Sequence, residues 1–313
     1  MKAASIPVDL FNPGQVFACL GFLEAADELL GNAEGGFNWS DSLGSHFELK
    51  ADCDDNPIEQ VLDRLAEATC QELEPKVWPG ERATSAMVAE CFPSQLQDHF
   101  DKKAKKWTRT SLPISITVPR SNSPASVTLT SWTDGSSRPL FKLYSGNRSA
   151  YSIASNMLKG KRSKPTKTCP AGKVETKGVR QLWREKRAQL IQAPFDVLCS
   201  MGGSFNFDPR GGWTALDAGF SPDQQSKTGL LDGVAASPVV EMLAAWGLEH
   251  ARPDEYKTRQ VRYGVWQGLV PPMLARAAIS GAEVVRPFRR FRFMLALSGK
   301  NKVVTFAMED MDS

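Results

Sequence analysis

The sequence predicts an α+β fold in which short strands and amphipathic helices alternate along the chain. Three observations lead to this prediction. Apolar residues recur at helical spacing in several segments that begin with a capping residue followed by proline. Other, shorter segments alternate apolar and polar residues between clusters of turn-forming residues. In addition, 42% of the 313 residues are apolar, which is enough for one large core or two modest ones.

The N-terminal segment predicts a strand followed by a helix. Ser5–Leu10 is short and alternates between apolar and polar residues. Helical spacing of apolar residues follows and continues to Gly31. Asn12 is suited to the N-cap, and Pro13 to the first helical position. We therefore expect a helix that begins after Asn12 and ends at Gly31.

A hairpin, a second helix and two further strands come next. The segments FNWSD and HFELKAD alternate like paired strands, and Asn56 with Pro57 begins the amphipathic segment IEQVLDRLAEATCQEL. Strands are predicted at Leu112–Arg120 and Ser126–Trp132. The resulting order, β-α-β-β-α-β, is that of the ferredoxin-like fold, which many RNA-recognition domains share. An ordinary α+β domain is the alternative.

The rest of the chain repeats this theme after an insertion. A helix ending near Gly160 is followed by a lysine-rich segment that we expect to be a mobile loop, and then by a helix at Gly178–Gln192. Ser237 begins a helix that is expected to stop near Gly247, and a strand, a helix and a hairpin complete a second β-α-β-β unit. We expect an N-terminal ferredoxin-like part (1–135), a basic insertion (136–200) and a C-terminal part (201–313) on the same core.

Charge is distributed unevenly, although the net charge is only +3. Residues 1–100 carry 5 Lys/Arg and 18 Asp/Glu, residues 101–190 carry 20 and 4, and residues 191–313 carry 13 and 13. The basic central segment predicts binding to phosphate groups, because each neutralised phosphate releases condensed counterions. The alternatives are a solvated basic loop, or a segment that neutralises the acidic N-terminal part.

Few residues indicate catalysis, metal binding or a membrane. The six cysteines form no C-x-x-C pair, there are three histidines, and no run of about 18 apolar residues or signal peptide is present. We predict a cytoplasmic protein with no catalytic residue, metal, cofactor or membrane partner. The set nearest to a metal-dependent nuclease site matches no motif that we can name and consists of Asp54, Asp55, Asp208, Asp217 and Asp232.

The candidate nucleic-acid-binding residues lie in five places: a lysine cluster, a turn followed by a basic segment, one helix face, a Gly-rich loop at 201–229 and a late strand. Aromatic side chains of the loop are expected to stack on bases, although they could instead hold a long connection in the core. In chain order the candidates are Lys102, Lys103, Lys105, Lys106, Lys142, Asn147, Arg148, Lys159, Lys161, Arg162, Lys164, Arg180, Arg184, Arg187, Phe205, Phe207, Arg210, Arg289, Arg290 and Arg292.

Several long segments resemble a known family. They are IPVDLFNPGQVFACLGFLEAADELL, SWTD followed by LFKLYSGNRSAYSIASNML, SFNFDPRGGWTALDAGFSPD and SPVVEMLAAWGLEHARP. Together they resemble a family of small proteins encoded in type I-G (formerly I-U) CRISPR-Cas operons. The resemblance implies a subunit or accessory of a crRNA-guided antiviral effector complex, with crRNA or target DNA and other effector subunits as partners. It assigns no catalytic residue.

The predicted function is therefore non-catalytic RNA or DNA binding within such a complex, through the sugar-phosphate backbone. Two alternatives remain open at this stage. One is a metal-dependent nuclease or an RNA-processing endonuclease. The other is a protein-protein adaptor that docks to effector subunits through the acidic surface of residues 1–100.

Overall fold

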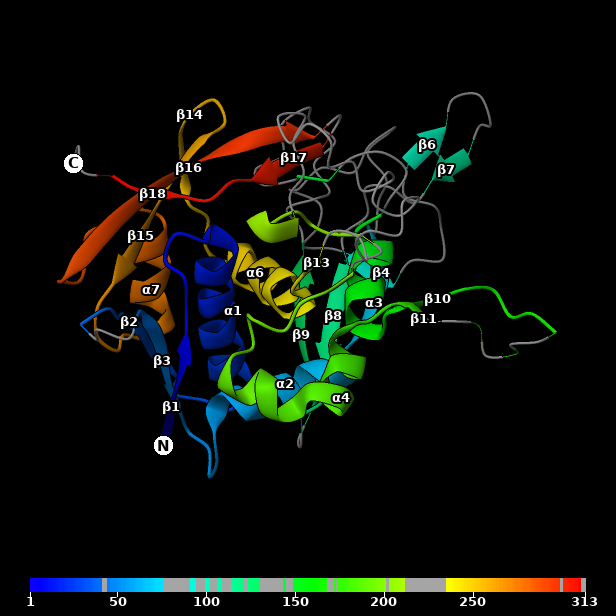
Figure 1. Ribbon diagram of the computed structural model, residues 1–313, viewed down its shortest axis with the longest axis horizontal. Helices are drawn as coiled ribbons and strands as arrows, with labels where there is room; N and C mark the ends of the chain where they lie inside the picture. Colours follow the sequence, from blue (N-terminus) through cyan, green and yellow to red (C-terminus); the bar gives the residue numbers. More distant parts are fainter. Residues whose placement is uncertain are drawn as a thin grey trace.

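The structure, a computed structural model, is a mixed α+β fold built around two helices (Figure 1). For residues 74–75, 91–93, 99–101, 106–108, 298 and 301 the backbone alone is described. The structure describes residues 1–40, 44–75, 91–93, 99–101, 106–108, 114–120, 123–129, 143–144, 149–167, 170, 172, 174–200, 203–211, 235–298 and 301–310.

The first four elements form a small sheet with one helix. The helix begins as predicted, because the Asn12 side chain accepts a hydrogen bond from the Gln15 backbone N–H at 3.2 Å. It ends before Gly31, which takes the positive φ of +93° that glycine tolerates. The strand order is β1-β3-β2, with both pairings antiparallel. The elements are β1 (Lys2–Pro7), α1 (Pro13–Leu29), β2 (Glu34–Asn38) and β3 (His46–Ala51).

After the second helix the chain enters a different sheet. Asn56 caps this helix as predicted, accepting from the Ile58 N–H at 2.9 Å. The helix ends at Glu67, and the last residues of the segment predicted to be helical form the strand β4, which pairs with β8 and β5, not with the first sheet. The elements are α2 (Pro57–Glu67), β4 (Thr69–Pro75), β5 (Cys91–Pro93), β6 (His99–Asp101), β7 (Lys106–Thr108), β8 (Ile114–Val118) and β9 (Ala125–Leu129).

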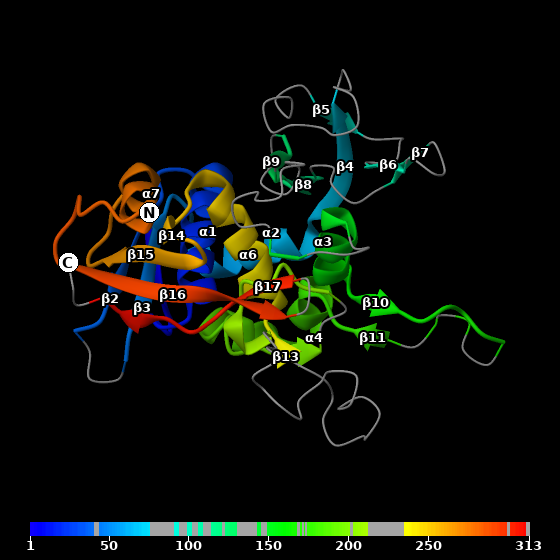
Figure 2. The same cartoon turned by 90° about the horizontal axis from the view of Figure 1, so that it is seen from above.

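A two-stranded arm extends away from the helices (Figures 1 and 2). The sequence predicts a loop here, but Lys161 pairs with Thr176 and Arg162 with Val174 in an antiparallel hairpin. The arm leaves the body between two helices that pack against each other. The elements are α3 (Ala150–Lys159), β10 (Lys161–Arg162), β11 (Val174–Thr176) and α4 (Val179–Gln192).

The C-terminal part forms a larger antiparallel sheet beside α7, in the order β14-β15-β16-β17, with β18 also pairing with β16. Strands β15 and β16, which precede and follow α7 in the sequence, pair directly with each other. The elements are β12 (Cys199–Ser200), a 3₁₀ turn (Pro209–Gly211), β13 (Ala235–Ala236), α6 (Pro238–His250), β14 (Asp254–Lys257), β15 (Gln260–Trp266), α7 (Pro272–Ile279), β16 (Phe288–Ser298), β17 (Asn301–Val304) and β18 (Met308–Glu309).

Helices α1 and α6 cross so closely that glycine is needed on both. A Cβ on Gly21 would lie 1.9 Å from the Leu243 carbonyl oxygen, and one on Gly247 would lie 2.6 Å from that of Phe17. The prediction that α6 stops near Gly247 is therefore wrong. The helix continues to His250, and Gly247 is a contact residue rather than a terminator.

The buried apolar residues form a continuous cluster, which runs in sequence from Ile6 to Val304 and draws on all three expected parts of the chain. Most of α1 and α6 is buried within it. In the described part of the chain, no helix is both long enough and apolar enough to cross a lipid bilayer.

Candidate nucleic-acid interface

The base of the arm is shaped by two facing glycines. Gly160 ends α3 at φ +74°, and Gly178 precedes α4. A Cβ on Gly178 would lie 2.4 Å from the Gly160 nitrogen and 2.6 Å from the Met157 carbonyl oxygen. The backbones at the two ends of the arm approach so closely that neither position leaves room for a side chain.

The arm is strongly basic. Residues 159–177 contain seven Lys/Arg and one acidic residue, Glu175. Lys161 pairs with Glu175 at 2.6 Å, and Arg162 donates to the Gly172 carbonyl oxygen at 3.2 Å. Lys164 and Lys167 are exposed and form no ion pair with any residue that the structure describes. The arm therefore presents cations to solvent at a distance from the core.

Helix α4 uses its first arginine for packing. Arg180 donates to the carbonyl oxygens of Ala66, Glu67 and Ala68, at 2.8, 3.2 and 3.3 Å. These carbonyls lie at the C-terminal end of α2, where the helix dipole is negative and backbone acceptors lack helical partners. Arg180 thus attaches α4 to α2.

Arg187 makes a second contact between the same helices. Its Nη2 lies 2.7 Å from Glu59 Oε1, and its guanidinium lies 4.5 Å from the centroid of the Trp183 ring. The Trp183 indole N–H donates to Asp63 at 2.9 Å. At this position the basic segment neutralises the acidic N-terminal part, which was one of the alternatives drawn from the charge distribution.

Arg184 is exposed and forms no ion pair with any described residue. Backbone angles at Lys186, φ −134° and ψ 29°, interrupt the helix between Arg184 and Arg187. The three arginines therefore do not form a continuous cationic face.

Arg290 and Arg292 lie on the outer face of β16, as the alternation predicts, while Phe291, Phe293 and Leu295 are buried. Arg289 lies on the same side of the strand as Phe291, with its guanidinium 5.1 Å from the centroid of the Phe291 ring. Each arginine has an acidic neighbour. Arg289 forms two hydrogen bonds of 2.6 Å with Glu309, which raise the pKa of Arg289 and lower that of Glu309. Arg290 lies 3.9 Å from Glu283, and Arg292 lies 3.6 Å from Asp310.

The Gly-rich segment corrects one prediction. Phe205 and Phe207 have no exposed surface, and their ring centroids lie 5.9 Å apart in the core. They are therefore not available to stack on bases, and the alternative of a connection held by its aromatics applies to both. Arg210 is engaged as well, because its Nη2 lies 2.8 Å from the buried Asp208.

For most of the remaining candidate residues, the structure describes no side chain. Lys159 is exposed in the last turn of α3, beside the base of the arm. Lys106 begins β7, with its backbone alone described. Outside the described residues lie Lys102, Lys103, Lys105, Lys142, Asn147 and Arg148.

A polar cavity of about 450 Å³ that the sequence does not predict lies between α1, α6, α7 and β9. Glu28, Glu249, His250, Ser126 and Thr128 are among its lining residues. Most of the ionisable side chains that line the cavity are acidic, so it is unsuited to binding a phosphate group. The one sequence signal was Glu24, a charged residue within the apolar stretch of α1.

The described residues offer no site for metal binding or thiol chemistry. Among them, no group of three or more His, Cys, Asp or Glu side chains is placed to hold a metal ion. Burial raises the pKa of the Cys70 and Cys199 thiols to about 11, so both are neutral at physiological pH. Of the aspartates nearest to a nuclease set, Asp208 is buried, and Asp217 and Asp232 lie outside the described residues.

No protein-family model, no curated protein and no solved structure matches this chain.

Proposed function

We propose that this protein is a non-catalytic nucleic-acid-binding subunit or accessory of a crRNA-guided type I CRISPR effector complex. Its partners would be crRNA or target DNA together with other effector subunits. The observation that carries nucleic-acid binding is the arm, which extends away from the helices and whose sequence, residues 159–177, contains seven basic residues and one acidic residue. The resemblance of the long sequence segments to type I-G proteins supports the assignment to a CRISPR effector complex.

The chemistry of the arm favours contact with phosphates over contact with bases. Lysines act as flexible point charges and carry no base-pair code, whereas bidentate arginines and aromatic rings recognise bases. The arm has no aromatic residue in its sequence. It would therefore hold the sugar-phosphate backbone and leave sequence recognition to pairing between guide and target.

We also propose that α1 and the first three strands are a ferredoxin-like unit. The order β1-β3-β2, with antiparallel pairs and α1 between β1 and β2, supports this. In sequence, β4 follows α2, where the fourth strand of such a unit would come, but it pairs with β8 instead of β1. The unit would serve as the scaffold from which α2, α4 and the arm are placed.

Binding is tested by fluorescence anisotropy with a labelled single-stranded RNA, at several salt concentrations. The test variant combines Lys161→Gln, Lys164→Gln and Lys167→Gln. We expect the variant to bind at least tenfold more weakly, and the slope of log K against log salt to fall by about 2, because a single-stranded phosphate contact contributes about 0.7.

The control carries the same change in charge at three exposed sites away from the arm, Lys2→Gln, Lys257→Gln and Arg286→Gln. It should bind as the unmodified protein does. Equal weakening in both triple variants would show attraction by net charge alone, and would contradict a site on the arm.

Membership in a complex is tested by co-purifying the protein with the products of the neighbouring operon genes and sequencing any RNA that is retained. Stable association together with guide-derived RNA is expected. Purification of the effector complex without this protein would contradict the proposal.

A further inference from the structure

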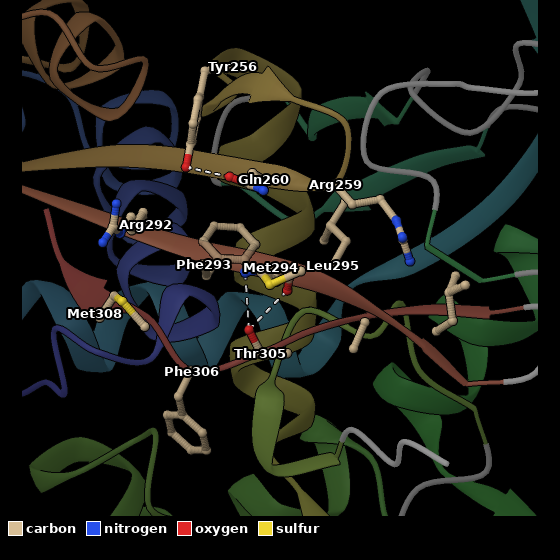
Figure 3. A pocket seen from close by; sticks show the side chains of 12 residues that line it. Tyr256, Arg259, Gln260, Arg292, Phe293, Met294, Leu295, Thr305, Phe306 and Met308 are labelled. Carbon is tan, nitrogen blue, oxygen red and sulfur yellow. Dashed lines mark hydrogen bonds between the residues drawn. The ribbon is translucent and has the colours of Figure 1, made fainter. Parts of the chain in front are cut away.

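The outer face of the C-terminal sheet contains an apolar groove of about 560 Å³ (Figure 3). It runs along β16, between the β14–β15 turn and the segment 305–308. Four large apolar side chains that line it are unusually exposed: Met294 (52%), Leu297 (50%), Phe306 (52%) and Met308 (58%). Grouped exposed apolar residues of this kind mark interaction surfaces, and methionine adapts its shape to a partner.

One wall of the groove is the edge of a strand. β15 pairs with β16 as far as Gln260 and Met294, and the Leu295 N–H still donates to the Arg259 carbonyl oxygen at 2.9 Å. Beyond that point, no strand that the structure describes pairs with the same edge of β16. Backbone groups alternate between the two edges of a strand, so Leu297, like Leu295, directs its N–H and C=O to this edge, whereas Ala296 pairs with Val303 of β17. Leu297 therefore lies at a strand edge beside an apolar surface, which is the arrangement that accepts an added strand.

The charges around the groove are almost fully matched, with one exception. At one end Arg292 lies 3.6 Å from Asp310. At the other end, the Arg259 guanidinium extends past the groove and forms no ion pair with any described residue (Figure 3). Its backbone is held by the Glu255 carboxylate, which accepts from the Arg259 N–H at 2.8 Å. A carboxylate on the occupant would complete this end.

The same charges disfavour nucleic acid as the occupant. A phosphate backbone needs several unmatched cations, but Arg262 and Arg292 already have acidic partners. Stacking is also hindered, because the Arg262 guanidinium lies 4.3 Å from the centroid of the Tyr256 ring and covers one face of it. An apolar centre with a polar rim is instead the usual anatomy of a protein-protein interface.

We propose that this groove binds an extended segment of another protein. The segment pairs with the edge of β16 at Leu297, places alternate apolar side chains against Met294 and Phe306, and directs an acidic side chain to Arg259. Main-chain hydrogen bonds supply affinity, while the groove and Arg259 select for alternation of apolar and acidic residues. The inference does not depend on the nucleic-acid-binding function of the arm.

The test is selection of random twelve-residue peptides displayed on phage against the immobilised full chain, followed by affinity measurement with a synthesised, fluorescent form of an enriched peptide. Enriched peptides should alternate apolar and acidic residues. We expect Met294→Asp to weaken binding at least tenfold, as for a residue at the centre of an interface, and Arg259→Gln to weaken it several-fold.

The control is Met273→Asp, because Met273 is 72% exposed on α7 and does not line the groove. It should bind the peptide as the unmodified protein does. No enrichment, or equal binding by Met294→Asp, would overturn the proposal. So would self-association that Met294→Asp abolishes, since the occupant would then be a second copy, or displacement of the peptide by single-stranded RNA.

Discussion

The carboxylate of Glu24 in α1 and the guanidinium of Arg276 in α7 form a bidentate ion pair, with Nε–Oε1 and Nη2–Oε2 distances of 2.7 and 2.6 Å. The Glu24 side chain is 3% exposed, and the Nδ1 atom of His250 in α6 lies 3.5 Å from it. Hydrogen bonds to Glu24 raise the pKa of Arg276. A single buried carboxylate therefore connects three helices.

We predict that Arg276→Met lowers the free energy of unfolding by about 3 kcal/mol, because it leaves the Glu24 carboxylate buried without its main partner. Adding Glu24→Leu should recover much of this loss, since no unpaired charge remains. Urea denaturation of the single and double variants measures both effects.

The control for this pair is Arg286→Met. Arg286 is 83% exposed and pairs with Glu283 at 2.8 Å. A solvent-exposed pair contributes about 0–1 kcal/mol, so this variant should be nearly as stable as the unmodified protein. If Arg276→Met were equally mild, the ion pair would not hold the helices together.

We predict that Gly247→Ala destabilises the protein by about 1–3 kcal/mol, because the added methyl group meets backbone atoms of α1 that cannot move independently. Intrinsic helix propensity argues for the opposite sign, since alanine is favoured over glycine by about 1 kcal/mol in a helix interior. Thermal unfolding decides between them. A higher melting temperature for the variant would contradict the close crossing of α1 and α6.

Local signals predicted most of the elements, while long-range partners were beyond the sequence. Asn12 and Asn56 were assigned as helix caps because a capping side chain acts on N–H groups only two or three residues away. The alternation in β16 was equally local. Nothing local indicates that β4 pairs with β8, which lies about forty residues later in the chain.

The same limit applies to the candidate site. Arg180 has the same sequence character as Arg184, but it lies against the end of α2, more than a hundred residues earlier in the chain. Phe205 and Phe207 stand in a glycine-rich segment that is typical of a ligand-binding loop, but they fill space in the core. The basic character of the arm could be predicted, because a local excess of lysine and arginine is read from the sequence without knowledge of which residues contact each other.

We predict that Asp208→Ala lowers stability by several kcal/mol, because this carboxylate accepts hydrogen bonds at the starts of two helices. Its oxygens accept from the Asn12 side chain at 3.3 Å, from the Ser237 N–H at 3.2 Å and from Arg210. Nuclease activity in the purified protein that Asp208→Asn abolished without loss of stability would contradict this structural role.

A neighbouring carboxylate predicts a dependence of stability on pH. Glu241 accepts from the Asp208 N–H at 2.8 Å and from the Phe205 N–H at 3.0 Å. Burial nevertheless outweighs these donors and raises the pKa of Glu241 from 4.5 to about 7. Because the folded protein holds this proton more tightly than the unfolded chain does, protonation stabilises the fold.

This contribution is fully present below about pH 4.5 and is lost as the pH rises through the folded-state pKa of about 7. Between pH 5 and pH 8 the loss should be on the order of 3 kcal/mol. Glu241→Gln cannot titrate, so the gap in unfolding free energy between the two proteins should change with pH over this window, whatever constant cost the amide brings. Urea denaturation at half-unit intervals measures the gap, and a gap that stays constant would show that Glu241 keeps an ordinary pKa in the folded protein.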